Sequence, residues 1–396
     1  MKSKIIALAL FAITVATVAF YPSYQSSGAI AKPPVDTLSN ERSHIEVVFA
    51  LDTTGSMSGL IQAAKEKIWS IASTMAQADP APEIKMGLVA YRDRGDDYVT
   101  RVVDLSDDLD SLYATLMDFQ AAGGGDGPES VNQALSDAVH KVSWSQNPNA
   151  YKVVFLVGDA PPHMDYQDDV KYHATIAAAA QKGIVVNAIQ CGASVPTAQE
   201  WQKIAKLGKG RYFQVEQEGS AVAIATPFDE KLAELSKELD DTRLYYGSAE
   251  EKDKRQQKIG AADKLHKGSS VESRARRAAF NASQSGEANF LGEGELVADV
   301  ASGRVHLESI AQEQLPDPMQ AMAPQEQKAL ITEKSKRRNE LQREIKEMAR
   351  SRSDFLKKKV AEQGGAKDSL DHKVHSAIRE QAGKQGLRYK ADALDY

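Results

Sequence analysis

Residues 44–59 have the sequence HIEVVFALDTTGSMSG, which joins a strongly apolar run to a short polar turn. The first eight of these residues, 44–51, are nearly all apolar and predict a strand that is buried on both of its faces. From Gly59 to Ala78, apolar residues recur at helical spacing and predict a helix. A buried strand that leads through a turn into a helix is typical of folds in which helices cover a parallel sheet.

Three oxygen-bearing side chains occupy alternate positions in the turn after this strand, namely Asp52, Thr54 and Ser56. Alternate residues can direct their side chains toward one point above the end of the strand. A carboxylate with two hydroxyls is a set of hard oxygen ligands, which suits Mg²⁺ or Mn²⁺ better than zinc. The same residues are also explained by a Ser or Thr that caps the following helix. Taken alone, this turn therefore supports a metal site and a helix cap about equally.

The pattern of alternating strands and helices continues to about residue 241. Further apolar strands are predicted at residues 84–92, 99–105, 152–159, 184–190 and 211–215. The first two of these are separated by a polar turn, 93–97, and indicate a hairpin. Helices are predicted between the other strands, at residues 107–119, 130–142, 168–182, 197–207 and 218–241. We therefore expect an α/β fold, doubly wound and Rossmann-like, with a mostly parallel sheet whose ligands bind beyond the carboxyl ends of its strands.

Two more acidic residues are predicted near that edge of the sheet. Asp126 belongs to the glycine-rich loop GGGDGPE, residues 123–129, and Asp159 is the last residue of the strongly apolar strand 152–159. Carboxylates that converge in one place repel each other unless a cation neutralises them. The three separated acids Asp52, Asp126 and Asp159 thus favour a metal site over a purely structural turn.

With these motifs in view, the sequence resembles a von Willebrand factor type A domain with a metal-ion-dependent adhesion site. The resemblance covers residues 43–241, and its three motifs occur in the expected order. It implies that Asp52, Thr54, Ser56 and Asp159 are metal ligands. Asp126 takes the position at which the family usually has a threonine, as in a subset of such domains.

The resemblance also implies how the site works. The protein would hold a divalent cation with an incomplete ligand shell, and an Asp or Glu side chain of a partner protein would supply the missing ligand. A direct carboxylate from Asp126 would lower the electrophilicity of the ion and shift its preference from Mg²⁺ toward Ca²⁺ or Mn²⁺. This mechanism is one of coordination without turnover.

The amino-terminal segment predicts export. Lys2 and Lys4 precede an apolar run, residues 5–20, and Ala29-Ile30-Ala31 offers a small-x-small cleavage site. We therefore expect a signal peptide at residues 1–31, a linker at 32–43 and a periplasmic or secreted protein. In the alternative, the uncleaved segment anchors the protein, which is the only membrane association that we expect. Cys191 is the only cysteine, so the chain can form no internal disulfide.

Beyond residue 241 the sequence becomes more polar. Residues 242–279 are rich in charge and predict a linker or a charged helix. Residues 280–396 predict a mainly helical region, in which a long helix at 323–362 has only a thin apolar stripe and favours a short helical hairpin or weak coiled coil. A last helix is predicted from residue 368 to about 382.

Charge distribution argues against a nucleic-acid partner. The formal net charge of the 396 residues is -6, and the excess of acid lies before residue 243. Phosphate binding needs clustered Lys and Arg, which this part of the chain lacks.

Two other functions compete with adhesion. The first is a phosphohydrolase that uses Asp52 as nucleophile, but Thr54 stands where such chemistry usually needs a second acid as proton donor. The second is an assembly factor that acts through its carboxyl-terminal helices. We expect no enzyme activity, because no complete catalytic set is present. We discount Arg94-Gly95-Asp96 as turn chemistry, and His163 as a residue of the rim.

Overall fold

The computed structural model describes residues 43–125, 127–217, 224–362 and 370–389. The predicted signal peptide, nearly all of the linker at 32–43, and Asp126 lie outside the described residues.

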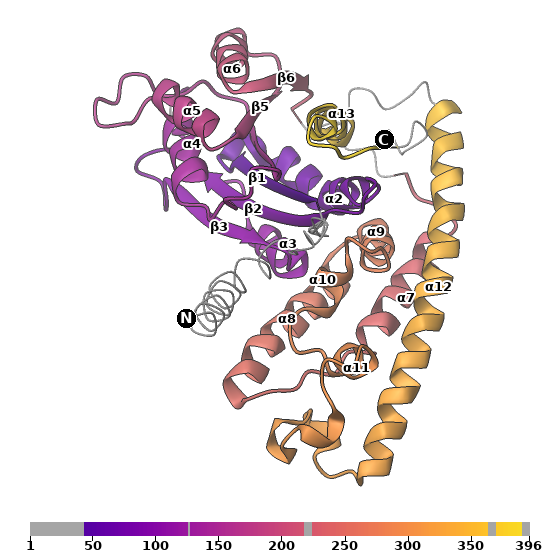
Figure 1. The fold of residues 1–396 in the computed structure, drawn as a ribbon. Helices are drawn as coiled ribbons and strands as arrows, with labels where there is room; N and C mark the ends of the chain where they lie inside the picture. Colours follow the sequence, from indigo (N-terminus) through magenta and orange to yellow (C-terminus); the bar gives the residue numbers. More distant parts are fainter. Residues whose placement is uncertain (1–42, 126, 218–223, 363–369, 390–396) are drawn as a thin grey trace, which may run out of the picture. The chain divides into compact units, whose positions relative to one another are not determined.

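A six-stranded sheet forms the centre of the first half of the chain, with the strand order β3-β2-β1-β4-β5-β6 (Figure 1). All neighbouring strands are parallel except β2 and β3, which form the predicted antiparallel hairpin. The strands are β1 (His44–Asp52), β2 (Glu83–Tyr91), β3 (Thr100–Ser106), β4 (Tyr151–Gly158), β5 (Ile184–Cys191) and β6 (Lys209–Val215). The predicted doubly wound, mostly parallel sheet is therefore confirmed. Because the chain winds outward in opposite directions from β1 and β4, the crevice beyond these two strands is the expected ligand position.

Alternate residues of each central strand enter two different hydrophobic cores. In β1, Val47 and Leu51 face one core, whereas Val48 and Ala50 face the other. This two-residue alternation explains why the strand has to be apolar throughout, since neither face is exposed to water.

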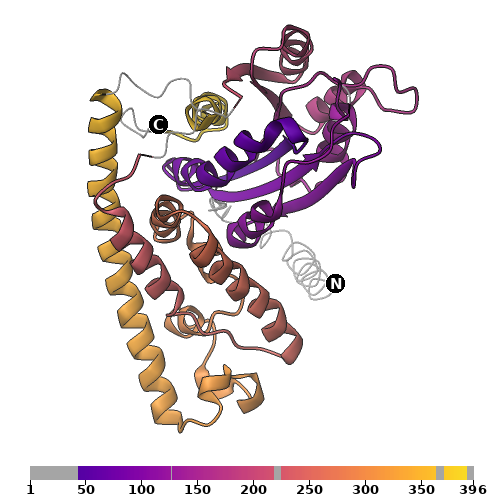
Figure 2. The same cartoon turned by 180° about the vertical axis from the view of Figure 1, so that it is seen from behind.

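Helices cover both faces of the sheet (Figures 1 and 2). A short 3-10 turn, η1 (Gly55–Met57), leads from β1 into the first helix. One face is covered by α2 (Ser58–Met75) and α3 (Leu109–Asp118). The other face is covered by α4 (Val131–His140), α5 (Tyr172–Gln181) and α6 (Val195–Leu207).

The last helix of the chain, α13 (Leu370–Gly383), also packs against this sheet, beside α2 and β6. Its residues Val374 and Ile378 are buried in the same core as α2. The side chain of Gln381 accepts a hydrogen bond from the Tyr151 hydroxyl at 2.6 Å and exchanges two hydrogen bonds with Asn187, at 2.8 and 3.1 Å. Residues from the end of the sequence therefore complete the core that begins with β1.

The helix that we expected to close the first domain has a different set of neighbours. Apolar residues of α7 (Asp229–Asp240) share a separate core with residues 275–290 and with Leu341 and Ile345 of α12 (Pro324–Glu362). The other helices of this region are α8 (Ala249–Gly268), α9 (Val271–Asn281), α10 (Glu287–Leu291) and α11 (Leu296–Ala301). Three short 3-10 turns precede α12, namely η2 (Leu307–Ser309), η3 (Gln312–Gln314) and η4 (Asp317–Met319). The predicted long helix at 323–362 is thus α12, which contacts α7, α9 and α11.

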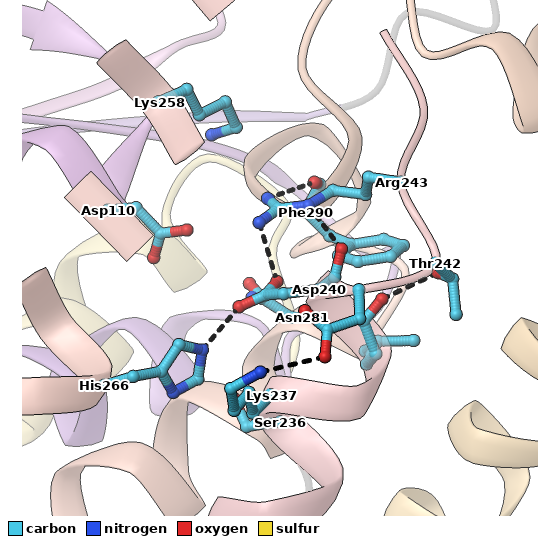
Figure 3. Close-up of polar contacts among 12 residues, drawn as sticks. Asp110, Ser236, Lys237, Asp240, Thr242, Arg243, Lys258, His266, Asn281 and Phe290 are labelled. Carbon is cyan, nitrogen blue, oxygen red and sulfur yellow. Dashed lines mark hydrogen bonds and ion pairs between the residues drawn. The ribbon is translucent and has the colours of Figure 1, made fainter. Parts of the chain in front are cut away.

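Residues 242–279, predicted as linker or charged helix, contain α8 and α9, and a buried ionic cluster explains how so polar a segment folds. Arg277 of α9 has no exposed surface and forms ion pairs with Asp110 of α3 at 2.5 Å and Asp240 of α7 at 2.7 Å. The Nε2 atom of His266 lies 2.7 Å from Asp240, and Arg243 also pairs with Asp240 (Figure 3). Burial favours the neutral acid, but the cations of Arg277 and Arg243 hold the pKa of Asp240 well below its usual range. Arg243 and Arg277, charged residues of the segment predicted as a linker, are therefore paired inside the protein.

No helix among the described residues is both long enough and apolar enough to cross a membrane.

The packing of α13 leads to a first prediction. Replacing Ile378 by Ala should lower the free energy of unfolding by about 2–4 kcal/mol, because the change leaves a cavity in the core of the sheet. The matched control is Leu207→Ala, since Leu207 is also a helical residue but is 47% exposed, and it should change the free energy by no more than about 0.5 kcal/mol. Chemical denaturation followed by circular dichroism measures both values. Equal effects of the two substitutions would contradict the role of α13.

Candidate metal centre

Asp52, Thr54 and Ser56 come together at the carboxyl end of β1, as the sequence predicted. Asp52 is the last residue of the strand and is 0% exposed. Its Oδ1 atom accepts hydrogen bonds from the backbone N–H of Thr54 at 2.8 Å and from the Thr54 hydroxyl at 2.7 Å. The hydroxyl oxygens of Thr54 and Ser56 are 3.3 Å apart. The three side chains thus place their oxygen atoms side by side at the start of η1.

The second carboxylate oxygen of Asp52 is the unusual feature of this turn. Oδ2 is buried and accepts no hydrogen bond of standard geometry from the described residues, although the backbone N–H of Asp159 lies close enough to help lower the pKa of this carboxyl. A buried acceptor without a well-formed hydrogen bond costs free energy, so it calls for a ligand to complete it. Gly158, at the end of β4, leaves the space beside it: a Cβ atom at this position would lie 3.0 Å from Oδ2 and would also collide with Tyr91. Oδ2 therefore lies beside Gly158, next to the crevice that is expected beyond the ends of β1 and β4.

Asp159 follows Gly158 directly and borders the same crevice. Its Oδ2 atom accepts a hydrogen bond from Gln217 at 2.7 Å, and its carbonyl oxygen accepts one from Thr197 at 2.9 Å. Gln217 also donates to the carbonyl oxygen of Ser56 at 3.3 Å. Gln217 follows β6 and gave no signal in the sequence, yet it joins two of the predicted ligand residues.

The glycine-rich loop folds back over the end of β1. The N–H of Gly55 donates to the carbonyl oxygen of Gly123 at 3.2 Å, and that of Ala122 donates to Thr53 at 3.1 Å. Gly124 has a positive φ of 77°, a conformation that glycine adopts without strain. A Cβ atom on Gly124 would lie 3.3 Å from both the Glu129 carboxylate and the Thr54 side chain. The absence of a side chain at Gly124 allows its backbone to lie close to both of these groups.

Glu129 is a buried acid at the site to which the sequence pattern assigns no role. Its side chain is only 4% exposed, and its Oε2 atom is buried without a hydrogen-bond partner among the described residues. The sequence pattern names Asp126 as the ligand from this loop. Asp126 lies outside the described residues, so its role stays a prediction. The signal that was available is position, because Glu129 stands just before α4, where the loop returns to the sheet edge.

Comparison with known proteins identifies this architecture. Residues 46–227 match the family model described as von Willebrand factor A domain. These residues form a von Willebrand factor A domain. The resemblance that the motifs indicated is confirmed for the domain.

A curated relative matches part of this chain. The alpha-protein kinase vwkA of Dictyostelium discoideum is 28% identical over 122 residues, which are 30% of this chain and 19% of that protein. The chain thus spans about a fifth of the length of this curated relative.

Similar solved structures were also found. Proximal thread matrix protein 1 (PTMP1) of the mussel byssus, in crystal form 2, has a TM-score of 0.36 at 17% identity, over 45% of this chain and 43% of that one. A structure of PTMP1 with a zinc-occupied MIDAS motif has a TM-score of 0.35 at 17% identity, over 44% and 42%. The SpRpn10 VWA domain has a TM-score of 0.34 at 12% identity, over 44% of this chain and 89% of that one.

The electrostatics of the site in the von Willebrand factor A domain favour a cation. Burial and the nearby charge of Asp159 raise the pKa of Asp52 to about 7, against the hydrogen bonds from Thr54 that lower it. Burial and the charges of Asp52, Asp93 and Asp159 raise the pKa of Glu129 to about 9. Both acids are therefore costly to ionise without a compensating positive charge.

The donors are carboxylates combined with hydroxyls. Within the described ranges, no group of three or more His, Cys, Asp or Glu side chains is arranged to hold a metal ion. The oxygen atoms that lie side by side are those of the Asp52 carboxylate and the hydroxyls of Thr54 and Ser56, a set that fits Mg²⁺, Mn²⁺ or Ca²⁺. Asp159 and Glu129 are further acids, close enough to interact electrostatically with Asp52.

The Arg94-Gly95-Asp96 tripeptide is engaged within the domain. Arg94 pairs with Asp168 at 2.9 Å and with Asp169 at 2.5 Å. Asp96 accepts hydrogen bonds from the backbone N–H groups of Asp93 and Gly124 at 3.1 and 3.0 Å. Arg94 thus joins the turn to the connection between β4 and α5, and Asp96 joins it to the glycine-rich loop.

The raised pKa of Asp52 leads to a second prediction. An acid whose pKa is higher in the folded than in the unfolded state destabilises the fold as pH rises between the two values, here from about 4 to about 7. In EDTA, Asp52→Asn should therefore gain stability relative to the wild type as pH rises from 5 to 8, because Asn keeps the acceptor for Thr54 without the charge.

The measurement is the difference in Tm between the two proteins at each pH. Excess Mn²⁺ should stabilise only the wild type and abolish the advantage of Asp52→Asn at pH 8. If the difference in Tm changes with neither pH nor Mn²⁺, the ionised form of Asp52 does not destabilise the folded protein, and the prediction is wrong.

Proposed function

We propose that the protein is an exported, metal-dependent protein-binding module. Its von Willebrand factor A domain holds a divalent cation, and an Asp or Glu side chain of a partner protein completes the ligand shell of that ion. The observation that carries the proposal is the buried Oδ2 of Asp52, which accepts no hydrogen bond of standard geometry from the described residues, in a carboxylate that lies beside the hydroxyls of Thr54 and Ser56.

The ligand set defines the kind of ion. We propose Asp52, Thr54, Ser56 and Asp159 as ligands, with Glu129 and Asp126 as the acids from the glycine-rich loop. Mg²⁺ demands near-octahedral geometry, whereas Ca²⁺ accepts more oxygen ligands in flexible geometry. Each loop carboxylate that binds directly therefore shifts the preference from Mg²⁺ toward Ca²⁺ or Mn²⁺ and weakens the pull of the ion on a partner carboxylate.

Exposed apolar side chains on the same edge of the sheet support a protein partner. Met164 and Val170 follow β4 and are 40% and 54% exposed, and Val195 begins α6 after β5 and is 64% exposed. Exposed apolar surface gathered at one edge of a protein marks a site of interaction with other proteins. Leu207, which is also exposed, lies at the opposite end of α6.

We propose binding without turnover at this site. Asp52 has no exposed surface, and its Oδ1 atom already accepts two hydrogen bonds from Thr54, so it is poorly placed as a nucleophile for a phosphoryl group. Export rests on the amino-terminal charged and apolar segments.

A third prediction tests the metal. Titration calorimetry should detect uptake of Mg²⁺, Mn²⁺ or Ca²⁺ by the wild type and none by Asp52→Ala, because that change removes a central carboxylate. The control is Asp137→Ala, which removes another buried, hydrogen-bonded aspartate, on α4. Unchanged uptake by Asp52→Ala, or no uptake by the wild type, would refute the proposed site.

A fourth prediction tests the partner. Proteins captured from a cell-envelope extract in Mg²⁺ and released by EDTA should be lost with Asp52→Ala. Capture should be weakened by Val195→Ser, which changes the rim, and unaffected by Leu207→Ser at the other end of the same helix. Capture that withstands both EDTA and Asp52→Ala would show that another surface binds the partner.

A further inference from the structure

Asp93, in the connection between β2 and β3, contacts two segments that border the candidate metal centre. It is buried, with 6% of its surface exposed. Its Oδ1 atom accepts a hydrogen bond from the Ser130 hydroxyl at 3.0 Å, and its Oδ2 atom lies 3.3 Å from the His163 Nε2 atom. The Tyr166 hydroxyl also donates to this carboxylate, at 3.3 and 3.4 Å.

The two segments that Asp93 joins are the ones that carry Glu129 and Asp159. Ser130 follows Glu129 in the chain, and His163 belongs to the connection that begins with Asp159. The same two segments are joined by their backbones: the N–H of Glu129 donates to Pro161 at 2.9 Å, and the N–H of His163 donates to the carbonyl oxygen of Glu129 at 3.1 Å. Asp93 thus reinforces a short parallel bridge between Glu129 and Pro162.

The side chain of Glu129 depends on this support. Since its Oε2 atom has no hydrogen-bond partner among the described residues, the direction of the carboxylate depends largely on the backbone of Glu129 and on the close approach of Oε1 to Gly124. A ligand whose direction depends on its backbone needs a rigid backbone to keep its geometry.

The other groups around His163 hold the ring in one orientation. Its Nδ1 atom lies 2.8 Å from Asp165, and the ring stacks on Tyr166 with centroids 3.9 Å apart. The Tyr166 ring in turn has the guanidinium of Arg94 4.0 Å from its centroid. The imidazole is therefore fixed between two carboxylates and an aromatic ring.

From these contacts we infer that Asp93 is a positioning residue for the metal centre. Through Ser130 and His163 it fixes the backbone of Glu129 and its distance from Asp159, and so sets the geometry in which the ion is held. The inference rests on the proposed function, and it adds a residue that does not itself bind the ion.

The experiment measures Mn²⁺ alone, by calorimetry for affinity and by electron paramagnetic resonance for the symmetry of the bound ion. Asp93→Ala should weaken Mn²⁺ binding by about 10- to 100-fold, as loss of an outer-shell partner typically does, and should broaden the spectrum. Asp93→Asn keeps an acceptor for Ser130 and should restore most of the affinity.

Two further variants keep the test decisive. Ser130→Ala serves as the test if Asp93→Ala does not fold. It removes only the Ser130 side of the contact and should give a smaller loss of affinity with the same spectral change. Asp137→Ala, the matched buried aspartate, should leave affinity and spectrum unchanged. Wild-type affinity and spectrum in Asp93→Ala and Ser130→Ala overturn the inference, as does an equal loss in Asp137→Ala. A wild type that binds no Mn²⁺ overturns the proposed function as well, so the two failures are distinct.

Discussion

The carboxylate of Asp52 is fully buried at the point where the sheet reverses its winding direction, and within the described residues only its Oδ1 atom accepts hydrogen bonds of standard geometry. This arrangement constrains everything that surrounds it. β4 has to end in Gly158, since a side chain there would occupy the space beside Oδ2, and the loop from α3 has to approach through Gly124 with a positive φ. Glu129 then enters the same crevice and raises the local density of negative charge further. A cation resolves the conflict between burial and charge, because it supplies at once the missing partner and the missing positive charge.

The von Willebrand factor A domain of this chain is completed by a helix that is remote from it in the sequence. The helix α13 supplies core residues and hydrogen bonds to β4 and β5, although α7 to α12 separate it from β6 in sequence. The intervening helices form cores of their own, and an ionic cluster around Arg277 joins them to α3. Removing one partner from such a cluster leaves a buried charge without compensation. The cluster therefore makes the packing of these polar helices specific.

The metal centre is organised in two layers. Asp52, Thr54 and Ser56 lie next to one another in sequence, and their mutual hydrogen bonds hold them in place. Glu129 and Asp159 come from separate loops and need further contacts, which Gln217, Ser130 and Asp93 provide. The inner layer supplies the oxygens, and the outer layer determines how far apart they stand.

The amino-acid sequence by itself determined the sheet and the first part of the site. Residues 47–51 and 153–157 are apolar at every position, a pattern that is stable only for a strand covered on both faces. Residues 52, 54 and 56 occupy alternate positions in the turn that follows the first of these strands. Tertiary structure decided the rest, because it depends on contacts between residues far apart in the chain. The position of Glu129 depends on how the glycine-rich loop folds back. The packing of α13 against the sheet depends on a surface left open beside α2. Arg277 is buried only because Asp110 and Asp240 pair with it. Local hydrophobic periodicity shows which face of a helix or strand is buried, but it does not show which other element covers that face.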